Sequence, residues 1–440
     1  MPVLRSYPSQ LRRIVRLPLI SPRQWLRRVV FWVGAVVVAT VAIGFALLAD
    51  RASALFVRMQ APHPWVAFAI CPAGLVASFL LTRYVFPGAQ GSGIPQVIAG
   101  LHMTDREAIA RVLSLRVALG KVGLTLLGLG CGASIGREGP TVQVGAAIMH
   151  AFGRLLRLPR LDLERALVLA GGAAGVAAAF NTPLAGVVFA IEELSHAFES
   201  RTSGVVLTAV IIAGITTLAL AGNYTYFGHT SETLDLGRGW IAVVLCSGAG
   251  GLAGGLFSTA LVRFAGGLPG RLGHWVVRWP AVFAALCGLA IALCGLLSDG
   301  QTYGTGYDQA RSMMEGHNTL PASYAALKFA ATVVSYVSGI PGGIFAPSLA
   351  VGAGLGESLS HLIPAAPTGA VVLLGMVAYF SGVVQAPITA AVIVMEMTDN
   401  QGMTIPLLAT SFLAFGVSRL VCRRPIYAAL ARRFLQAHSQ

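Results

Sequence analysis

Charged side chains are scarce in this sequence. Only 11% of its 440 residues are charged, 17 of them acidic, and no hydrophilic stretch is long enough to form a separate soluble domain. Hydrophobic residues make up 55% of the chain and the mean hydropathy is +0.74, which is more apolar surface than the core of a soluble protein could bury. The sequence therefore predicts an all-α polytopic membrane protein.

Motifs of enzymes and metal sites are absent as well. The nine histidines form no HExxH, no GxSxG occurs, and the six cysteines form no CxxC pair. We interpret the cysteines as small residues packed in apolar segments, without a disulfide or metal role. These absences argue against an enzyme, and no cofactor is expected. The cysteines are Cys71, Cys131, Cys246, Cys287, Cys294 and Cys422.

Basic residues are concentrated near the two ends of the chain, although a net charge of +14 could suggest a nucleic-acid binder. This distribution is the positive-inside pattern of two cytoplasmic termini, so no nucleic-acid partner is predicted. The first uncharged run, residues 29–49, has about the 20 residues that a helix needs to cross a bilayer. Its length and its long basic lead argue against a cleaved signal peptide.

Further apolar segments follow, and Gly or Pro interrupts many of them. An interrupted helix is tolerated at membrane depth only where its freed backbone groups face protein or a water-filled cavity. The interruptions are therefore where a binding site is expected. The segments cover residues 65–81, 114–134, 166–191, 205–221, 241–262, 281–297, 324–338, 371–397 and 405–421.

Two stretches of the chain repeat each other. "GREGPTVQVGA" aligns with "GIFAPSLAVGA" and places Pro140 on Pro347, a separation of 347 − 140 = 207 residues. "NTPLAGVVFAIEE" aligns with "QAPITAAVIVMEM" and places Glu192 on Glu396, 204 residues apart. Matches in the same order at nearly the same separation favour an internal duplication over chance. Two related halves with interrupted helices are typical of secondary transporters, whose site lies near the midplane where the halves meet.

Three short motifs share one pattern, flexible glycines followed by a proline. They are GSGIP at residues 91–95, GREGP at 136–140 and GGIFAP at 342–347. Because proline fits the first helical turn, we expect each motif to lead into a helix N-terminus inside the membrane. Unpaired amide groups and a partial positive charge at such a terminus suit an anion. Together the three motifs predict a buried anion site.

These motifs, together with PIY at residues 425–427, resemble the signature set of the CLC family of chloride channels and proton/chloride antiporters. The resemblance runs from about Gly91 to Tyr427 in the family's order. It implies a homodimer with a separate pore in each subunit. It also implies that each subunit consists of two halves of inverted topology, whose broken helices converge with their N-termini on the anion site.

The expected division of the chain follows from this resemblance. A basic cytoplasmic segment at 1–28 precedes two membrane halves at 29–230 and 231–427, and a short cytoplasmic tail occupies 428–440. The nucleotide-binding domains that some family members carry after the membrane part are not expected. A bacterial inner membrane is the expected location.

The resemblance also implies a chloride site. It assigns the hydroxyl groups of Ser92 and Tyr427, and the backbone N–H groups of Ile344 and Phe345, to a dehydrated chloride ion. A hydroxyl group replaces part of the hydration shell without adding a full charge, so the ion is held but can still leave. Serine at position 92 favours chloride over nitrate within the family. Taken alone, Ser92 could cap a helix and Tyr427 could anchor the chain at the membrane interface.

Glu138 resembles the family's gating glutamate, which takes the place of the anion when ionised and leaves the path when protonated. A charge at the centre of a membrane helix costs about 3 kcal/mol, so the neighbouring Arg137 and Glu138 require an explanation. One alternative is that the two side chains neutralise each other. We expect Arg137 to support the site electrostatically. Lys121 matches a family lysine with the same role, although it could instead extend toward the membrane surface.

Glu193 matches the intracellular proton acceptor of the family's exchangers, where its channels generally have a neutral residue. The alternative is an ordinary charge in water at the end of a helix. Glu192, aligned with Glu396, is expected to have a structural role. Gln96 stands where many relatives have an acid, and it alters the local field.

The two carboxylates Glu138 and Glu193 favour a chloride/proton antiporter with a glutamate gate, whose partners are chloride, protons and the lipid bilayer. A passive chloride channel of the same family and an exporter of fluoride or nitrate are the alternatives, with the serine and tyrosine motifs counting against fluoride. A membrane scaffold would not need three interrupted-helix motifs.

Overall fold

The computed structural model describes residues 22–155, 161–195, 200–222, 225–228, 230–235, 237–316 and 320–438. Most of these residues lie in helices. Two isolated β-bridges are the β-structure found among the described residues. The prediction of an all-α protein is confirmed. The basic segment at residues 1–21, which includes Arg12, Arg13 and Arg16, lies outside the described residues, as do the last two residues of the tail.

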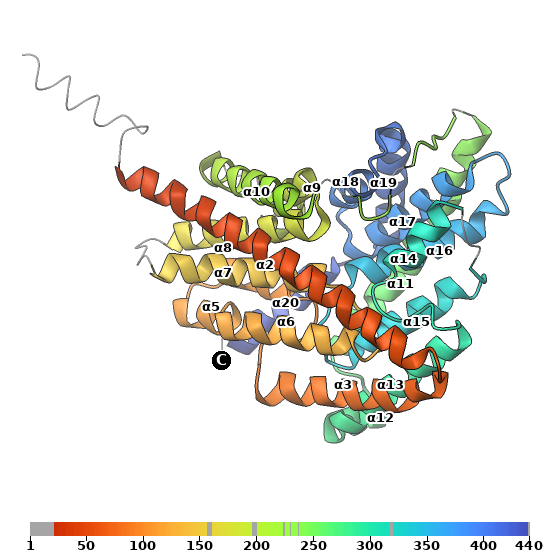
Figure 1. Ribbon diagram of the computed structural model, residues 1–440, viewed down its shortest axis with the longest axis horizontal. Coiled ribbons are helices and arrows are strands. Elements are labelled where there is room, and N and C mark those ends of the chain that lie inside the picture. The colour runs from red at the N-terminus through yellow and green to blue at the C-terminus, as the bar shows by residue number, and fades with distance from the viewer. Residues whose placement is uncertain are drawn as a thin grey trace, which may run out of the picture.

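The helices form two groups along the chain (Figure 1). The first group consists of α2 (Pro22–Gln60), α3 (Ala67–Tyr84), α4 (Ile94–His102), α5 (Arg106–Val112), α6 (Leu115–Leu129), α7 (Glu138–Leu155), α8 (Leu161–Phe180), α9 (Pro183–Phe189), the π-helical turn η2 (Ala190–Ser195) and α10 (Ser200–Ala221). The second group consists of α11 (Ile241–Ala265), α12 (Gly270–Arg278), α13 (Pro280–Leu297), α14 (Tyr307–Met314), α15 (Tyr324–Val337), α16 (Phe345–Ser360), α17 (Thr368–Val384), α18 (Pro387–Thr398) and α19 (Thr404–Val421).

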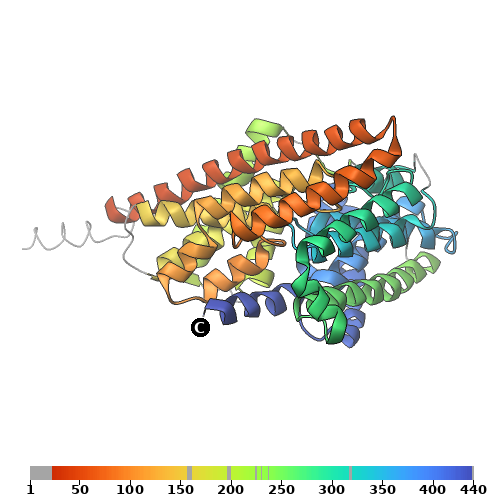
Figure 2. The ribbon, with the colours of Figure 1, turned by 90° about the horizontal axis from the view of Figure 1, so that it is seen from below.

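The last helix, α20 (Ile426–His438), joins the two groups. Figures 1 and 2 show it in dark blue, running from the second group back beneath the first, where it packs on α4. Helix α3 of the first group likewise lies beside α13 of the second, and α9 beside α18. The chain therefore has a long seam at which residues of both groups meet.

Eight helical stretches of the described chain are long and apolar enough to cross a membrane, which confirms a multi-pass membrane protein. The first expected span, residues 29–49, is longer than predicted, because α2 continues to Gln60. Asp50 lies within this helix, and its carboxylate pairs with the buried Arg137.

The interruptions that the sequence predicted are present and occur at matching places. Helix α8 ends at Phe180 and α9 begins at Pro183, whereas α17 ends at Val384 and α18 begins at Pro387. Between each pair lies a non-glycine residue with positive φ, Asn181 at 56° and Gln385 at 60°, again 204 residues apart. Such a backbone is uncommon outside glycine, so its recurrence supports the internal duplication. The inverted relation of the halves stays a prediction.

Glycines bring neighbouring helices close together in both groups. A Cβ atom on Gly145 of α7 would overlap the carbonyl oxygen of Gly171 of α8, and one on Gly352 of α16 would lie 2.6 Å from that of Gly375 of α17. Small residues at helix contacts are typical of membrane proteins, where close backbone approach supplies van der Waals packing. All six cysteines are buried and free, as expected for packing residues.

Candidate anion-binding site

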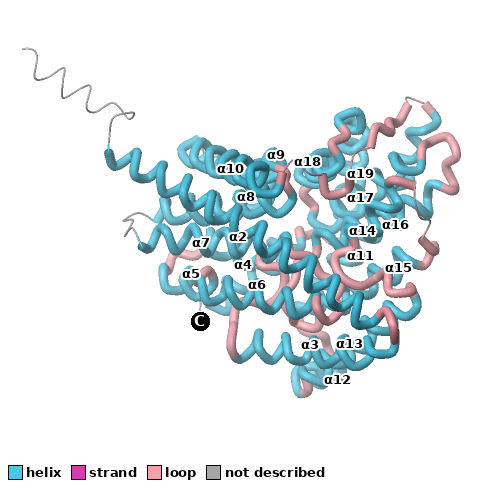
Figure 3. The backbone as a smooth tube through the Cα atoms, viewed as in Figure 1, coloured by secondary structure: helices cyan, strands magenta, loops and turns pink. Residues whose placement is uncertain are grey.

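The three glycine and proline motifs meet inside the molecule. As predicted, each precedes a helix, and α4, α7 and α16 begin at Ile94, Glu138 and Phe345. Figure 3 shows the connecting loops enclosed by helices. Sequence alone indicated three separate helix starts, and the structure brings them to one place.

Backbone hydrogen bonds hold the three loops together. Gly136 and Gly343 donate to each other's carbonyl oxygens, both at 2.7 Å. The N–H of Gly91 donates to Ile340 O at 3.2 Å, and the N–H of Gly342 donates to Gly91 O at 3.1 Å. These bonds satisfy buried backbone groups that no helix could pair, so the loops are stable at this depth.

Two glycines allow the loops to approach so closely. Gly93 has φ of 99°, and a Cβ atom there would lie 3.0 Å from the carbonyl oxygen of Gly139. A Cβ atom on Gly139 would overlap Ser92 Oγ. The hydroxyl group of Ser92 is therefore packed against the first turn of α7.

Ser92 and Tyr427 are both fully buried, and neither hydroxyl group has a hydrogen-bond partner among the described residues. The capping alternative for Ser92 is wrong, because Gly93 is the N-cap of α4 and no side chain caps that helix. The interfacial alternative for Tyr427 is also wrong, because its ring packs 6.0 Å from that of the buried Phe345. A buried polar group without a partner is costly, and two such hydroxyl donors fit an anion.

Ile344 and Phe345 are the N-cap and the first residue of α16, and both are buried. Amide groups in a first helical turn have no partner within the helix, so they are available to an anion. Three further aromatic rings surround Phe345 and keep its environment apolar. They belong to Phe180, Phe189 and Phe380.

Glu138, the first residue of α7, is fully buried. Its Oε1 accepts a hydrogen bond from the hydroxyl group of Tyr307 at 2.7 Å, and its Oε2 has no partner among the described residues. A Cβ atom on Gly136 would overlap Oε2 and would lie 3.3 Å from Cβ of Ala346. The carboxylate therefore lies where the first turns of α7 and α16 meet.

Arg137 does not neutralise Glu138, so that alternative is wrong. Its Nη1 donates to Asp50 Oδ1 and to Ala46 O, both at 2.6 Å, and its Nη2 donates to the hydroxyl group of Tyr226 at 2.9 Å. In the part of the chain that is described, no ion pair joins Arg137 to Glu138. Neighbouring residues at a helix start point in different directions, which separates the two side chains.

Glu193 is only 2% exposed, so it is not a charge in water at a helix end. It lies in the π-helical turn η2, and its Oε1 has no hydrogen-bond partner among the described residues. π-Helical turns frequently occur at functional sites. Burial of a carboxyl group with an unpaired oxygen agrees with a residue that exchanges a proton.

Glu192 and Glu396 have the structural role expected of them. The carboxylate of Glu192 accepts from the amide groups of Ile388 and Thr389, at 3.1 and 2.6 Å, and so caps α18. The carboxylate of Glu396 accepts from Leu184 and Ala185, at 3.1 and 2.7 Å, and caps α9. Each half thus satisfies the helix start of the other.

Lys121 is fully buried and points into the protein, so it does not extend toward the membrane surface. Its Nζ donates to the carbonyl oxygens of Gln90 and Gly91, at 3.2 and 2.8 Å. The Nζ group therefore holds the loop that carries Ser92.

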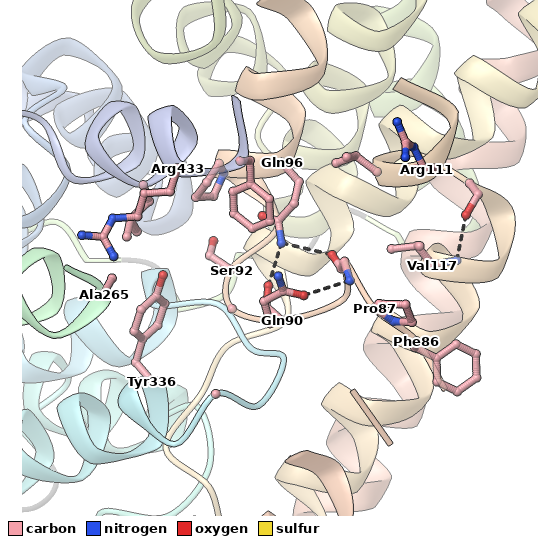
Figure 4. A pocket seen from close by; sticks show the side chains of 18 of the residues that line it. Phe86, Pro87, Gln90, Ser92, Gln96, Arg111, Val117, Ala265, Tyr336 and Arg433 are labelled. Atoms are coloured by element: carbon pink, nitrogen blue, oxygen red, sulfur yellow. Dashed lines mark hydrogen bonds between the residues drawn. The ribbon is translucent and has the colours of Figure 1, made fainter. Parts of the chain in front are cut away.

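A cavity of about 870 Å³ opens onto Ser92 (Figure 4). Of the described residues that line it, three are arginines, Arg111, Arg116 and Arg433, and none is acidic. Gln96 lines the cavity too, where its amide group donates to Gln90 O at 2.7 Å. A basic lining concentrates anions at the entrance of a cleft.

Sequence reasoning missed two residues of this region, Tyr307 and Lys328. The buried Lys328 donates to Thr302 O and Gly304 O, at 2.9 and 2.8 Å, much as Lys121 holds the loop of Ser92. Lys328 follows Lys121 by the same 207 residues that separate Pro140 from Pro347, and GTGY at 304–307 parallels GSGI at 91–94. The internal duplication, extended to these segments, would have identified Lys328 and its loop, but it aligns Tyr307 with Ile94 and gives no signal for the tyrosine hydroxyl group.

Comparison with known proteins agrees with this geometry. Solved structures similar to this chain include a slow cyanobacterial Cl⁻/H⁺ antiporter, with 26% identity and a TM-score of 0.79, covering 94% of this chain and 99% of that one. A CLC-type fluoride/proton antiporter has 23% identity and a TM-score of 0.78, with 91% and 97% covered. A eukaryotic CLC transporter has 20% identity and a TM-score of 0.75, with 93% and 74% covered. The latter two show the fold alone.

The model of the voltage-gated chloride channel family matches residues 73–419, which include the motifs at 91–95, 136–140 and 342–347. The match covers most of the chain, with helices of both groups and three of the four expected chloride contacts, Ser92, Ile344 and Phe345. On the strength of this match and of the fold, the chain belongs to the voltage-gated chloride channel family, the CLC family of channels and antiporters.

Proposed function

We propose that this protein is a chloride/proton antiporter in which Glu138 is the gate and Glu193 the internal proton acceptor. Chloride binds the hydroxyl groups of Ser92 and Tyr427 and the amide groups of Ile344 and Phe345. Arg137 and Lys121 support this site electrostatically. Each subunit consists of two halves of inverted topology, two subunits form a dimer in a bacterial inner membrane, and the termini are cytoplasmic.

One observation carries the proposal: two buried carboxyl groups, each with an unpaired oxygen, lie near a buried tyrosine whose own hydroxyl group is unpaired. Tyr427 lies close enough to both Glu138 and Glu193 for electrostatic interaction. A buried carboxyl group without a basic partner is most easily tolerated when it can take up a proton. Proton exchange between two such groups beside an anion site is the chemistry of an antiporter.

Anion passage is the better supported part of the proposal. A cavity lined by three arginines reaches Ser92, and the helix starts beyond it offer amide groups and positive dipole ends. The similar cyanobacterial structure is that of a Cl⁻/H⁺ antiporter, which favours the same pair of ions here. The Ser92 and Tyr427 hydroxyl pair favours chloride over fluoride.

The experiment is a flux assay on purified protein in liposomes, with a chloride gradient and a pH electrode. An antiporter lets chloride run down its gradient and drives protons uphill in the opposite direction. Chloride movement without proton movement would mean a channel of the same family. Proton-coupled movement of fluoride but not of chloride would favour the exporter instead.

A further inference from the structure

Tyr307 is the protein's own partner for the carboxylate of Glu138. It is the first residue of α14, it is buried, and its hydroxyl group donates to Glu138 Oε1 at 2.7 Å. The two residues are 169 apart in sequence and belong to different helix groups. The bond therefore ties the start of α7 to the start of α14 across the seam.

Aromatic contacts fix the ring of Tyr307. It packs on the rings of Tyr226 and Phe227, with centroids 5.0 and 5.5 Å away. The guanidinium group of Arg137 lies 6.0 Å from its centroid and 5.6 Å from that of Tyr226. Contacts of this kind orient a ring, so they direct the hydroxyl group toward Glu138.

Lys328 fixes the backbone that leads into Tyr307. Its Nζ group donates hydrogen bonds to Thr302 O and Gly304 O, and these bonds hold the loop that precedes α14. Gly306 has φ of 84° and turns the chain into α14. It lies close to the lysine side chain, since a Cβ atom on Gly306 would lie 3.0 Å from Lys328 Cε. Contacts that do not involve Glu138 thus fix the position of the Tyr307 hydroxyl group.

We propose that Tyr307 is a positioning residue of the gate, whose hydroxyl group holds the ionised Glu138 in place and sets the pH at which the gate opens. This inference rests on the proposed gate function of Glu138. An ionised carboxylate accepts a stronger hydrogen bond than a neutral carboxyl group, so the contact favours the closed, ionised state. Opening must break it.

Other groups that act on Glu138 are held by contacts that do not involve the hydroxyl group of Tyr307. Arg137 directly precedes α7 but is bound to Asp50 of α2 and to Tyr226. Tyr427 of α20 contributes a further electrostatic interaction. The first turn of α16 contains no titratable side chain. Removal of one oxygen atom from Tyr307 therefore changes one contact of the gate.

The test compares wild-type protein with Tyr307→Phe in liposomes, with chloride flux measured from acidic to alkaline pH. Phenylalanine retains the ring contacts, so the fold is preserved. Without the hydroxyl group the gate is protonated, and opens, at higher pH. The midpoint of the flux profile is expected to move upward by roughly one pH unit, which corresponds to about 1.4 kcal/mol.

Two further variants separate this role from a structural one. Tyr303→Phe is the matched control, because this buried tyrosine on the same loop donates to Ala292 O and not to Glu138. Its profile is expected to coincide with that of the wild type. Combined with Glu138→Ala, the Tyr307→Phe change is expected to have no effect on the profile.

Superposed profiles of the wild type and Tyr307→Phe would overturn the inference, and so would a shift that persists in the Glu138→Ala background. Proton coupling is recorded in the same experiment and is judged separately. A wild type that conducts chloride without protons contradicts the antiporter proposal, whereas the shift of the flux profile still decides the role of Tyr307.

Discussion

At the scale of single residues, Glu193 is the side chain that we propose separates an antiporter from a channel. Its burial, with one oxygen unpaired, is what a proton acceptor requires. Glu193→Gln keeps the shape but cannot release a proton, so uphill proton movement is expected to be lost while chloride flux continues. Proton and chloride electrodes on the same liposomes measure both. Glu357→Gln changes another buried acid and is the control, which is expected to retain proton coupling. Unchanged proton transport in Glu193→Gln would show that Glu193 is not part of the proton path.

Ser92 is the residue that we expect to set anion preference. Ser92→Ala removes the hydroxyl group alone, whereas Ser92→Pro also removes a backbone N–H. A hydrogen bond to a charged partner contributes about 1.5–3 kcal/mol, so chloride binding to Ser92→Ala is expected to weaken roughly tenfold or more. Titration calorimetry measures this, and a competition with nitrate measures the expected shift of Ser92→Pro toward nitrate. Equal chloride affinity in all three proteins would exclude Ser92 from the site.

At the scale of helices, the exchange of caps between α9 and α18 couples the two halves of the chain. Glu192 caps α18 and Glu396 caps α9, each with two hydrogen bonds from amide groups. Loss of a cap costs about 1 kcal/mol in typical proteins, and a carboxylate at a helix start adds a favourable dipole term.

Glu192→Ala and Glu396→Ala are therefore each expected to lower the midpoint of thermal unfolding in detergent, by similar amounts. The two caps lie side by side, so the double variant is expected to deviate from the sum of the single ones. Glu107→Ala changes an exposed acid at the start of α5 and is the control. If neither single variant differed from Glu107→Ala, the exchanged caps would have no role in stability.

At the scale of the whole molecule, the proposed site residues meet within one chain. Ser92, Glu138, Phe345 and Tyr427 come from both helix groups of one chain, and no partner chain is needed to bring them together. If the protein is a dimer, its two pores are therefore expected to work independently. A linked dimer with one Glu138→Ala subunit should keep about half of its coupled flux, measured per dimer in liposomes. Complete loss of coupling would mean that the subunits share a path.

The sequence by itself determined the membrane class, the helix starts and the identity of the site motifs. The length of an apolar run and the backbone preferences of glycine and proline act within a few residues of the chain. For this reason α4, α7 and α16 begin where the motifs predict. The separation of 204 residues likewise anticipated the paired roles of Glu192 and Glu396.

Only the tertiary structure decided which side chains meet. Arg137 is adjacent to Glu138 in sequence but pairs with Asp50, whereas Tyr307, 169 residues away, contacts Glu138. Whether Glu193 lies in water or is buried, and whether Lys121 points outward or inward, depended on the neighbouring helices. Contacts across the seam join segments that are far apart along the chain, and no local periodicity or spacing encodes the direction of a side chain between two packed helix groups.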